Sequence, residues 1–100
     1  MDITLQYFNG CPGWEQMDAH LEALAAEGID LRVSYQLIDT PEAAAVAGFR
    51  GSPTVLFDGT DPFTNPDAPV GLSCRVYRTE KGFAGTPTLD QLRDAVAAAS

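Results

Sequence analysis

The chain has 100 residues, which is enough for one domain with a sizeable core and too few for two, so we expect a single domain spanning residues 1–100. Its 14 Asp and Glu residues outnumber 6 Lys and Arg residues, and the net charge of −8 opposes binding to nucleic-acid backbones and anionic membranes. We attribute this acidity to solubility alone.

The chain contains only two cysteines, Cys11 and Cys74, too few for a framework of structural disulfides. No C-x-x-C pair or Cys/His cluster indicates structural zinc, and we expect no cofactor. The first residues, Met1 to Leu5, include no basic region and no long apolar run, so we expect neither a signal peptide nor a membrane span and a cytoplasmic location. Nothing in the sequence indicates an oligomeric state.

The first predicted strand runs from Ile3 to Phe8 and is apolar on both faces near its end, which is typical of a central strand covered by helices on both sides. A helix is predicted from about Pro12 to Glu27, where Gly28 ends it. Apolar residues recur at helical spacing along it and predict its buried stripe. They are Trp14, Met17, Leu21, Leu24 and Ala25.

A second strand and a short helix follow. Apolar and polar residues alternate from Leu31 to Ile38, which predicts a strand with one more exposed face. Thr40 is the expected N-cap of the next helix, Pro41 its first residue and Gly48 its end. This order of strand, helix, strand and helix implies a right-handed parallel crossover.

The second half of the chain predicts two strands and a terminal helix. One strand spans Val55 to Phe57 and the other Leu72 to Thr79, separated by a Pro-, Asp- and Asn-rich loop from Thr60 to Gly71. Long loops in compact domains tend to be functional or mobile. The stretch from Thr88 to Gln91 has the form of a capping box that opens the last helix. The inward stripe of that helix is Leu89, Leu92 and Val96.

Cys11 lies where the first strand passes through a Gly turn into the first helix. Unpaired N–H groups and the macrodipole stabilise a thiolate at a helix start, so we expect the pKa of Cys11 to lie below the free value of about 8.5. Such a cysteine is a candidate nucleophile or soft-metal ligand, and the alternative is a small buried hydrophobic residue. His20, the single histidine, lies about 13 Å further along the helix axis and cannot serve as its general base within this helix.

The segment Cys11-Pro12-Gly13-Trp14 at a strand-to-helix junction resembles the active site of the thioredoxin-like superfamily. A second segment, Gly51-Ser52-Pro53-Thr54-Val55, resembles the x-Pro-Thr motif of that family, which implies a cis Ser52–Pro53 peptide beside Cys11. Composition alone favours a trans bond, since only about 5% of X-Pro bonds are cis. Trp14 stands where a dithiol thioredoxin has its second cysteine, so the local resolving thiol is missing.

The resemblance implies an α/β fold of the thioredoxin-like type: a mixed four-stranded sheet flanked by helices in the order βαβαββα, with the long loop inserted before the last strand. It also implies a thiol–disulfide redox protein, a candidate oxidoreductase, with Cys11 as the attacking thiolate and Cys74 as a distant resolving thiol. The substrate is then a protein or small-molecule thiol or disulfide. The residues expected to contact it are Pro12, Trp14, Ser52 and Pro53.

Two other functions stay open. Two thiolates from separate elements are soft ligands for a thiophilic ion such as mercury, copper or zinc, and the separated pair Cys11 and Cys74 is distantly similar to that of organomercurial lyases. Those enzymes have an aspartate shortly after the first cysteine, where this chain has Trp14, and Asp61 is the candidate substitute. The third function is a non-catalytic interaction module that binds a partner peptide along the Pro53 edge.

The sequence also leaves open whether Cys74 approaches Cys11. If the last strand begins at the opposite end of the sheet, six residues at about 3.3 Å each separate the sulfurs by about 20 Å, beyond the Cα limit of about 7 Å for a disulfide. The loop from Thr60 to Gly71 is also long enough to return across the sheet edge and bring the two together. Similarity to enzymes that pair distant cysteines favours this path, and a reducing cytoplasm would make such a bond transient or catalytic.

Overall fold

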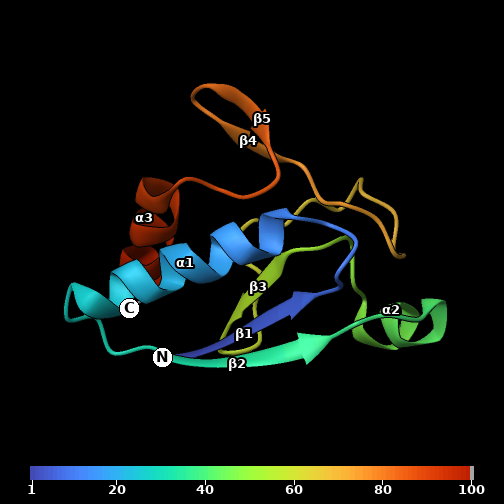
Figure 1. Ribbon diagram of the computed structural model, residues 1–100, viewed down its shortest axis with the longest axis horizontal. Coiled ribbons are helices and arrows are strands. Elements are labelled where there is room, and N and C mark those ends of the chain that lie inside the picture. The colour runs from blue at the N-terminus through green and yellow to red at the C-terminus, as the bar shows by residue number, and fades with distance from the viewer. Residues whose placement is uncertain (100) are drawn as a thin grey trace.

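A computed structural model describes residues 1–99, which form a mixed α/β structure (Figure 1). The strands are β1 (Asp2–Tyr7), β2 (Arg32–Leu37), β3 (Thr54–Phe57), β4 (Tyr77–Thr79) and β5 (Gly82–Ala84), and the helices are α1 (Gly13–Ala26), α2 (Pro41–Ala47) and α3 (Leu89–Ala99). None of the helices in this part of the chain has the apolar length that a membrane crossing requires.

Strand β1 is the central strand of a three-stranded mixed sheet with the order β2-β1-β3. It pairs in parallel with β2, where Leu5 opposes Tyr35, and antiparallel with β3, where Leu5 opposes Val55. The connection through α1 is therefore the expected parallel crossover. The central position predicted for the first strand is confirmed.

The main core lies between one face of this sheet and helices α1 and α3. Ile3 and Leu5 of β1 are fully buried there, because alternate residues of a strand point to the same face. Ala25, predicted in the buried stripe of α1, is instead exposed. The buried side chains that the two helices contribute are Met17, Leu21, Leu24, Leu92 and Val96.

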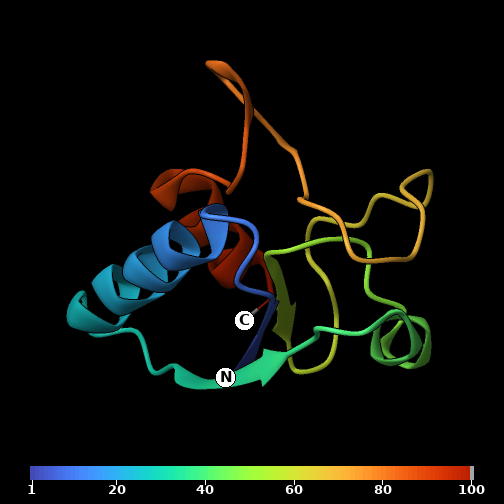
Figure 2. The ribbon, with the colours of Figure 1, turned by 45° about the vertical axis from the view of Figure 1, so that its right-hand side comes forward.

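Helix α2 lies apart from this core, beyond the carboxyl ends of β1 and β2 (Figures 1 and 2). Its Ala44 packs with Ile38 and Phe49 in a second, smaller cluster. The sheet face opposite the main core carries polar side chains, among which the Gln6 amide donates to the Gln36 side chain at 3.0 Å. The sequence predicts helices over both faces, whereas α1 and α3 share one face and α2 lies at the strand ends.

The caps predicted for α2 and α3 are confirmed. The Thr40 hydroxyl accepts a hydrogen bond from the Ala43 N–H at 3.1 Å, and Gly48 ends α2 in the left-handed conformation with φ of 66°. At α3 the Gln91 N–H donates to the Thr88 hydroxyl at 3.1 Å, and the Thr88 N–H donates to the Gln91 side chain at 2.8 Å. These reciprocal bonds make a capping box.

The last strands differ from the prediction of a four-stranded sheet in the order βαβαββα. Among residues 1–99, β4 pairs with β5 in a separate hairpin and not with β3. The strand predicted from Leu72 to Thr79 is regular only from Tyr77 onward, and before it Cys74 forms an isolated parallel bridge with Ser52. The hairpin then projects away from the sheet (Figure 2).

Candidate functional site

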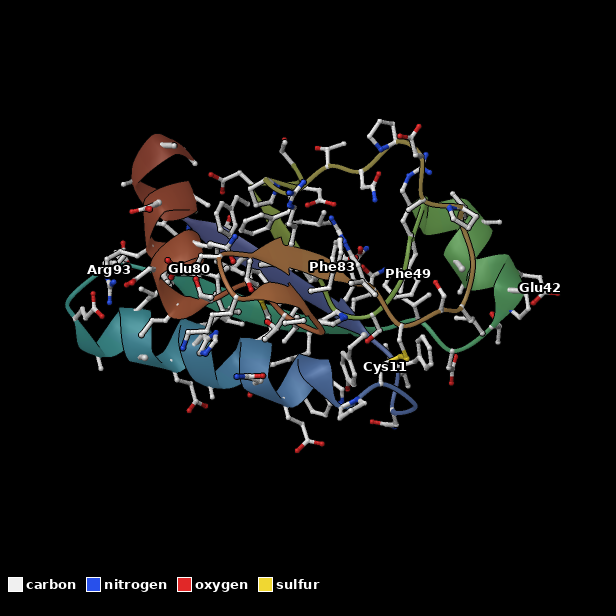
Figure 3. All side chains as sticks on the ribbon, turned by 90° about the horizontal axis from the view of Figure 1, so that it is seen from above. Cys11, Glu42, Phe49, Glu80, Phe83 and Arg93 are labelled. Carbon is white, nitrogen blue, oxygen red and sulfur yellow. A yellow bond between two sulfur atoms is a disulfide. The ribbon has the colours of Figure 1, made fainter. Side chains whose placement is uncertain are left out.

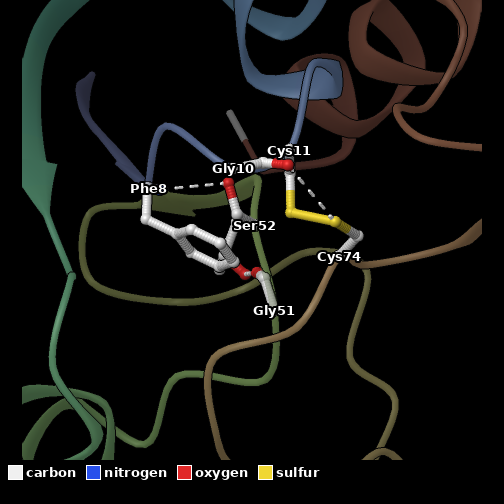
Figure 4. The surroundings of a disulfide bond; sticks show 7 residues. Phe8, Gly10, Cys11, Gly51, Ser52 and Cys74 are labelled. Carbon is white, nitrogen blue, oxygen red and sulfur yellow. Dashed lines mark hydrogen bonds between the residues drawn. A yellow bond between two sulfur atoms is a disulfide. The ribbon is translucent and has the colours of Figure 1, made fainter.

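The two cysteines, Cys11 and Cys74, form a disulfide bond across a sequence separation of 63 residues, with their Cα atoms 5.5 Å apart (Figure 4). The expectation that the inserted loop returns to Cys11 is confirmed, and the separation of about 20 Å given by simple strand topology is wrong for this chain. Cys11 lies beside the first turn of α1, on the side toward α2 (Figure 3).

Cys11 is fixed by the way α1 begins. Pro12 is the N-cap of α1 and already has helical angles (φ −68°, ψ −18°), so Cys11 lies immediately before the N-cap, at the predicted helix start. Gly13 is required by packing, because a Cβ there would lie 2.4 Å from the backbone oxygen of Gly85. The start of α1 therefore rests directly on the segment that joins β5 to α3.

Cys74 is held by backbone hydrogen bonds on both of its sides. The Ser52 N–H donates to the Ser73 carbonyl at 2.8 Å, and the Arg75 N–H donates to the Ser52 carbonyl at 2.9 Å. Gly51 permits this approach, because a Cβ there would lie 3.0 to 3.1 Å from Arg75 and Ser73 atoms, and its φ of +119° favours glycine. The position of Cys74 therefore does not depend on the disulfide alone.

Ser52 and Pro53 link this bridge to the central strand. The Ser52–Pro53 peptide is cis, which confirms the prediction. The Ser52 hydroxyl is buried and accepts a hydrogen bond from the Phe8 N–H at 3.2 Å, just past the end of β1 (Figure 4). The Tyr77 hydroxyl donates to the Pro53 carbonyl at 2.5 Å, and burial raises the pKa of Tyr77, so this donor keeps its proton.

Arg75 organises the surroundings of the site, although no sequence motif marks it. Its side chain is buried and donates to the Thr54 hydroxyl at 3.1 Å, to the Asp61 carboxylate at 2.8 Å and to the Phe63 carbonyl. Its guanidinium carbon also lies 4.6 Å from the centre of the Tyr77 ring. One feature of the sequence could have identified Arg75: it is a positively charged residue inside a predicted strand. A charged side chain that is buried there requires a partner of opposite charge or hydrogen-bond acceptors.

Asp61, the candidate acid for carbon–mercury cleavage, is already engaged. Its carboxylate pairs with Arg75 at 2.8 Å and accepts the Phe63 N–H at 2.8 Å. In residues 1–99, no group of three or more His, Cys, Asp or Glu residues is placed to hold a metal ion. After reduction, Cys11 and Cys74 are therefore the two candidate ligands for a soft metal.

The other two residues expected to contact substrate, Pro12 and Trp14, differ in their surroundings. Pro12 is exposed at the start of α1. Trp14 is half-buried against the main core and stacks on Tyr7, with ring centroids 4.4 Å apart and an angle of 30° between the rings. Trp14 therefore joins the end of β1 to the first turn of α1.

The two halves of the disulfide differ in exposure. Cys11 is 1% exposed, whereas Cys74 is an exposed residue. A hollow of about 310 Å³ opens beside Cys74, with Arg50 and Val76 also in its lining. The site therefore combines a buried cysteine at a helix start with an exposed cysteine on a loop.

The chain matches no protein-family model, and no curated protein matches it. Function is therefore inferred from the geometry of the site. Two sulfur atoms that meet in a scaffold of hydrogen bonds are suited to reversible disulfide chemistry or, when reduced, to binding a soft metal ion.

Proposed function

We propose that this protein is a thioredoxin-like thiol–disulfide oxidoreductase whose redox pair is Cys11 and Cys74. The observation that carries the proposal is the meeting of two cysteines 63 residues apart in sequence, with a Cα separation of 5.5 Å. This separation lies within the range of about 4.4 to 6.8 Å typical of disulfides. Cys74 supplies the second thiol that the Cys11-Pro12-Gly13-Trp14 segment lacks.

Hydrogen bonds outside the disulfide support reversible closure of the pair. Ser52 forms hydrogen bonds with Phe8, which is close in sequence to Cys11. It also forms hydrogen bonds with the residues on both sides of Cys74. In the reduced protein these bonds hold the two thiols near each other. A preformed arrangement of this kind gives the intramolecular reaction a high effective concentration.

The position of Cys11 at the start of α1 supports a reactive thiolate. No side-chain hydrogen bond caps the start of α1, where the N-cap is Pro12. The N–H groups of that turn and the helix dipole stabilise negative charge, so we expect the pKa of the reduced Cys11 thiol to lie below about 8.5. A thiolate formed near neutral pH attacks disulfide sulfurs, and the displaced thiolate takes a proton from water.

The thioredoxin-like fold is part of this proposal. Its support is the order from β1 to β3 with one parallel and one antiparallel pairing, a Cys-Pro step before α1, and a cis Ser52–Pro53 peptide beside the disulfide. In chain order the β4–β5 hairpin takes the place of the last sheet strand of that fold, but it forms a separate two-stranded sheet. We place the protein in the cytoplasm, where the disulfide forms transiently during exchange with thiols and disulfides of proteins or small molecules.

Mass spectrometry after mild oxidation and alkylation tests the redox pair. We expect the wild-type protein to lose two hydrogen atoms and resist alkylation, and both Cys11→Ser and Cys74→Ser to remain alkylated at their single thiol. Glutathione buffers of increasing reducing power should then convert the wild-type bond reversibly to the dithiol. Oxidation that yields only intermolecular dimers or glutathione adducts would contradict the proposal.

Binding of a thiophilic ion is a second candidate function, because the contact that permits a disulfide also lets two thiolates bind one soft ion. Two thiolates alone suit Hg(II) or Cu(I) better than zinc, which takes four ligands in structural sites. Titration of the reduced protein with each ion, using Cys11→Ser and Cys74→Ser as controls, separates the functions. Stoichiometric binding without redox cycling would favour the metal site. If the protein shows neither metal binding nor redox cycling, a non-catalytic interaction module is favoured.

A further inference from the structure

We infer that external thiols exchange with this site at Cys74, that Cys11 is the sulfur that leaves, and that the preferred thiol is small and negatively charged. This direction of attack rests on the proposed function and adds the entry point and the substrate class. The sequence alone favours Cys11 as the residue that meets the substrate. The difference in exposure between the two cysteine residues favours the reverse order.

Access decides which sulfur of a disulfide is attacked. Cys11 is 1% exposed, whereas Cys74 is exposed and borders a hollow of about 310 Å³ whose lining does not include Cys11. This volume is at the lower end of small-molecule sites, which hold about 300 to 1,000 Å³. The hollow therefore suits a low-molecular-weight thiol.

The environment of Cys11 suits a leaving group. An incoming thiolate forms a bond to the Cys74 sulfur, the bond between Cys74 and Cys11 breaks, and Cys11 leaves as a thiolate stabilised by the start of α1. A second thiolate then attacks the mixed disulfide, which releases the disulfide of the small thiol and leaves the protein as a dithiol. Two thiols are oxidised and one protein disulfide is reduced. The reverse sequence uses the Cys11 thiolate to attack the mixed disulfide at Cys74.

Arg50 provides the charge preference. It lines the same hollow as Cys74, and its guanidinium donates to the carbonyls of Pro66, at 3.4 Å, and Ala68. None of the ion pairs within residues 1–99 includes Arg50, whereas Arg75 in the same lining is paired with Asp61. Arg50 therefore adds an uncompensated positive charge to a chain of net charge −8. A carboxylate on the incoming thiol is attracted to it.

Peptide mapping tests the entry point in the oxidised wild-type protein. The protein is mixed with limiting mercaptoacetate, quenched with acidic N-ethylmaleimide and digested with trypsin, which places Cys11 in peptide 1–32 and Cys74 in peptide 51–75. We expect mercaptoacetate on Cys74 and maleimide on Cys11. Mercaptoacetate on Cys11, or equal labelling of both cysteines, would overturn the inference.

The single-cysteine variants decide the same point if the mixed disulfide is too short-lived in the wild type. Reduced Cys11→Ser should form an adduct with dithiodiglycolate at least about tenfold faster than reduced Cys74→Ser, because burial limits access to Cys11. Equal rates or the opposite order would overturn the inference. If instead no thiol reduces the wild-type bond, the proposed function itself fails.

Charge selection is tested by comparing mercaptoacetate with the neutral 2-mercaptoethanol as reductants. Arg50→Gln should slow reduction by mercaptoacetate about three- to fivefold and leave reduction by 2-mercaptoethanol unchanged. Arg78→Gln is the matched control, since Arg78 is exposed, carries the same charge and lines a different hollow. Equal slowing of both thiols by Arg50→Gln, or equal effects of the two variants, would overturn the charge preference.

Discussion

The Arg75 N–H donates to the Ser52 carbonyl at 2.9 Å, which places the residue after Cys74 against the residue before Pro53. Ser52 also accepts the Phe8 N–H through its hydroxyl at 3.2 Å. One buried serine thus positions both segments that carry the disulfide. Substitutions that displace Arg75 are therefore expected to disturb the Cys11–Cys74 disulfide without touching either sulfur.

Arg75→Met should destabilise the protein and slow disulfide formation. The substitution leaves the Asp61 carboxylate, of which 21% is exposed, without the cation that pairs with it at 2.8 Å. Breaking a buried pair by removing one partner costs about 3 to 5 kcal/mol, and the remaining exposure of Asp61 favours the lower value. Denaturant unfolding of the oxidised protein measures the stability, and the rate of intramolecular closure in a glutathione buffer measures the positioning.

Arg93→Met is the control for loss of a paired arginine. Arg93 bonds to Glu27 at 2.6 Å, but both side chains are more than a third exposed (38% and 39%). Exposed ion pairs contribute little, so we expect a small change in the unfolding midpoint and no change in the closure rate. If Arg75→Met behaves like Arg93→Met, the buried arginine does not position Cys74.

Gly13→Ala tests the contact between the start of α1 and Gly85. Helix propensity alone predicts that alanine stabilises a helix by up to about 1 kcal/mol relative to glycine. The contact with Gly85 predicts instead that alanine destabilises the protein. The new Cβ would lie 2.4 Å from the Gly85 backbone oxygen, which cannot move aside as a flexible side chain could. We expect a loss of about 1 to 3 kcal/mol in the free energy of unfolding, as in other overpacked sites. A stabilised Gly13→Ala variant would show that the contact relaxes without cost.

Local signals predict much of this structure. Periodicity and caps correctly indicate β1, β2 and the three helices, since Thr40, Gly48 and Thr88 act within a few residues of their own positions. The two motif segments also correctly predict a cis Ser52–Pro53 peptide beside Cys11.

The path of the chain after β3 is set by contacts that local patterns do not encode. The pairing of Cys74 with Ser52 depends on a glycine at position 51 and on the side chain of Arg75, which reaches back to Asp61. Regular pairing begins only at Tyr77, and there it is with β5 and not with β3. Periodicity therefore predicts a strand here but not its partner.

Trp14→Ala should lower stability more than it alters exchange. Trp14 packs on the main core and stacks on Tyr7 at 4.4 Å, so truncation removes buried apolar area and a ring contact. We expect a loss of about 3 kcal/mol, the lower end for truncating a large aromatic residue, because the indole is only half-buried. Phe83→Ala is the control, since Phe83 is 75% exposed and should change the unfolding midpoint little. A midpoint unaffected by Trp14→Ala would identify the indole as a free binding surface.

Tyr77 gives the protein a dependence on alkaline pH whose sign follows from its pKa. Burial raises the pKa of Tyr77 above the value of about 10 expected in the unfolded chain. The stability that this group contributes is therefore complete below about pH 10 and is lost as the pH rises toward the higher pKa of the folded state. Tyr35 also makes stability fall with rising pH, since its hydrogen bond to Asp18 raises its pKa to about 12.

Tyr77→Phe and Tyr35→Phe separate the two contributions. Tyr77→Phe leaves the buried Pro53 carbonyl without its 2.5 Å hydrogen bond, which should cost about 1 to 3 kcal/mol at pH 7. It should also reduce the fall in stability between about pH 10 and pH 11, because the variant no longer has this ionisable group. Tyr35 is 53% exposed, so Tyr35→Phe should change stability little at pH 7, and solvent screening should make its share of the alkaline loss smaller than that of Tyr77. Urea unfolding of both variants at pH 7, 9, 10 and 11 measures how the free energy of unfolding changes with pH. If that energy falls as steeply in Tyr77→Phe as in the wild type, another group controls alkaline unfolding.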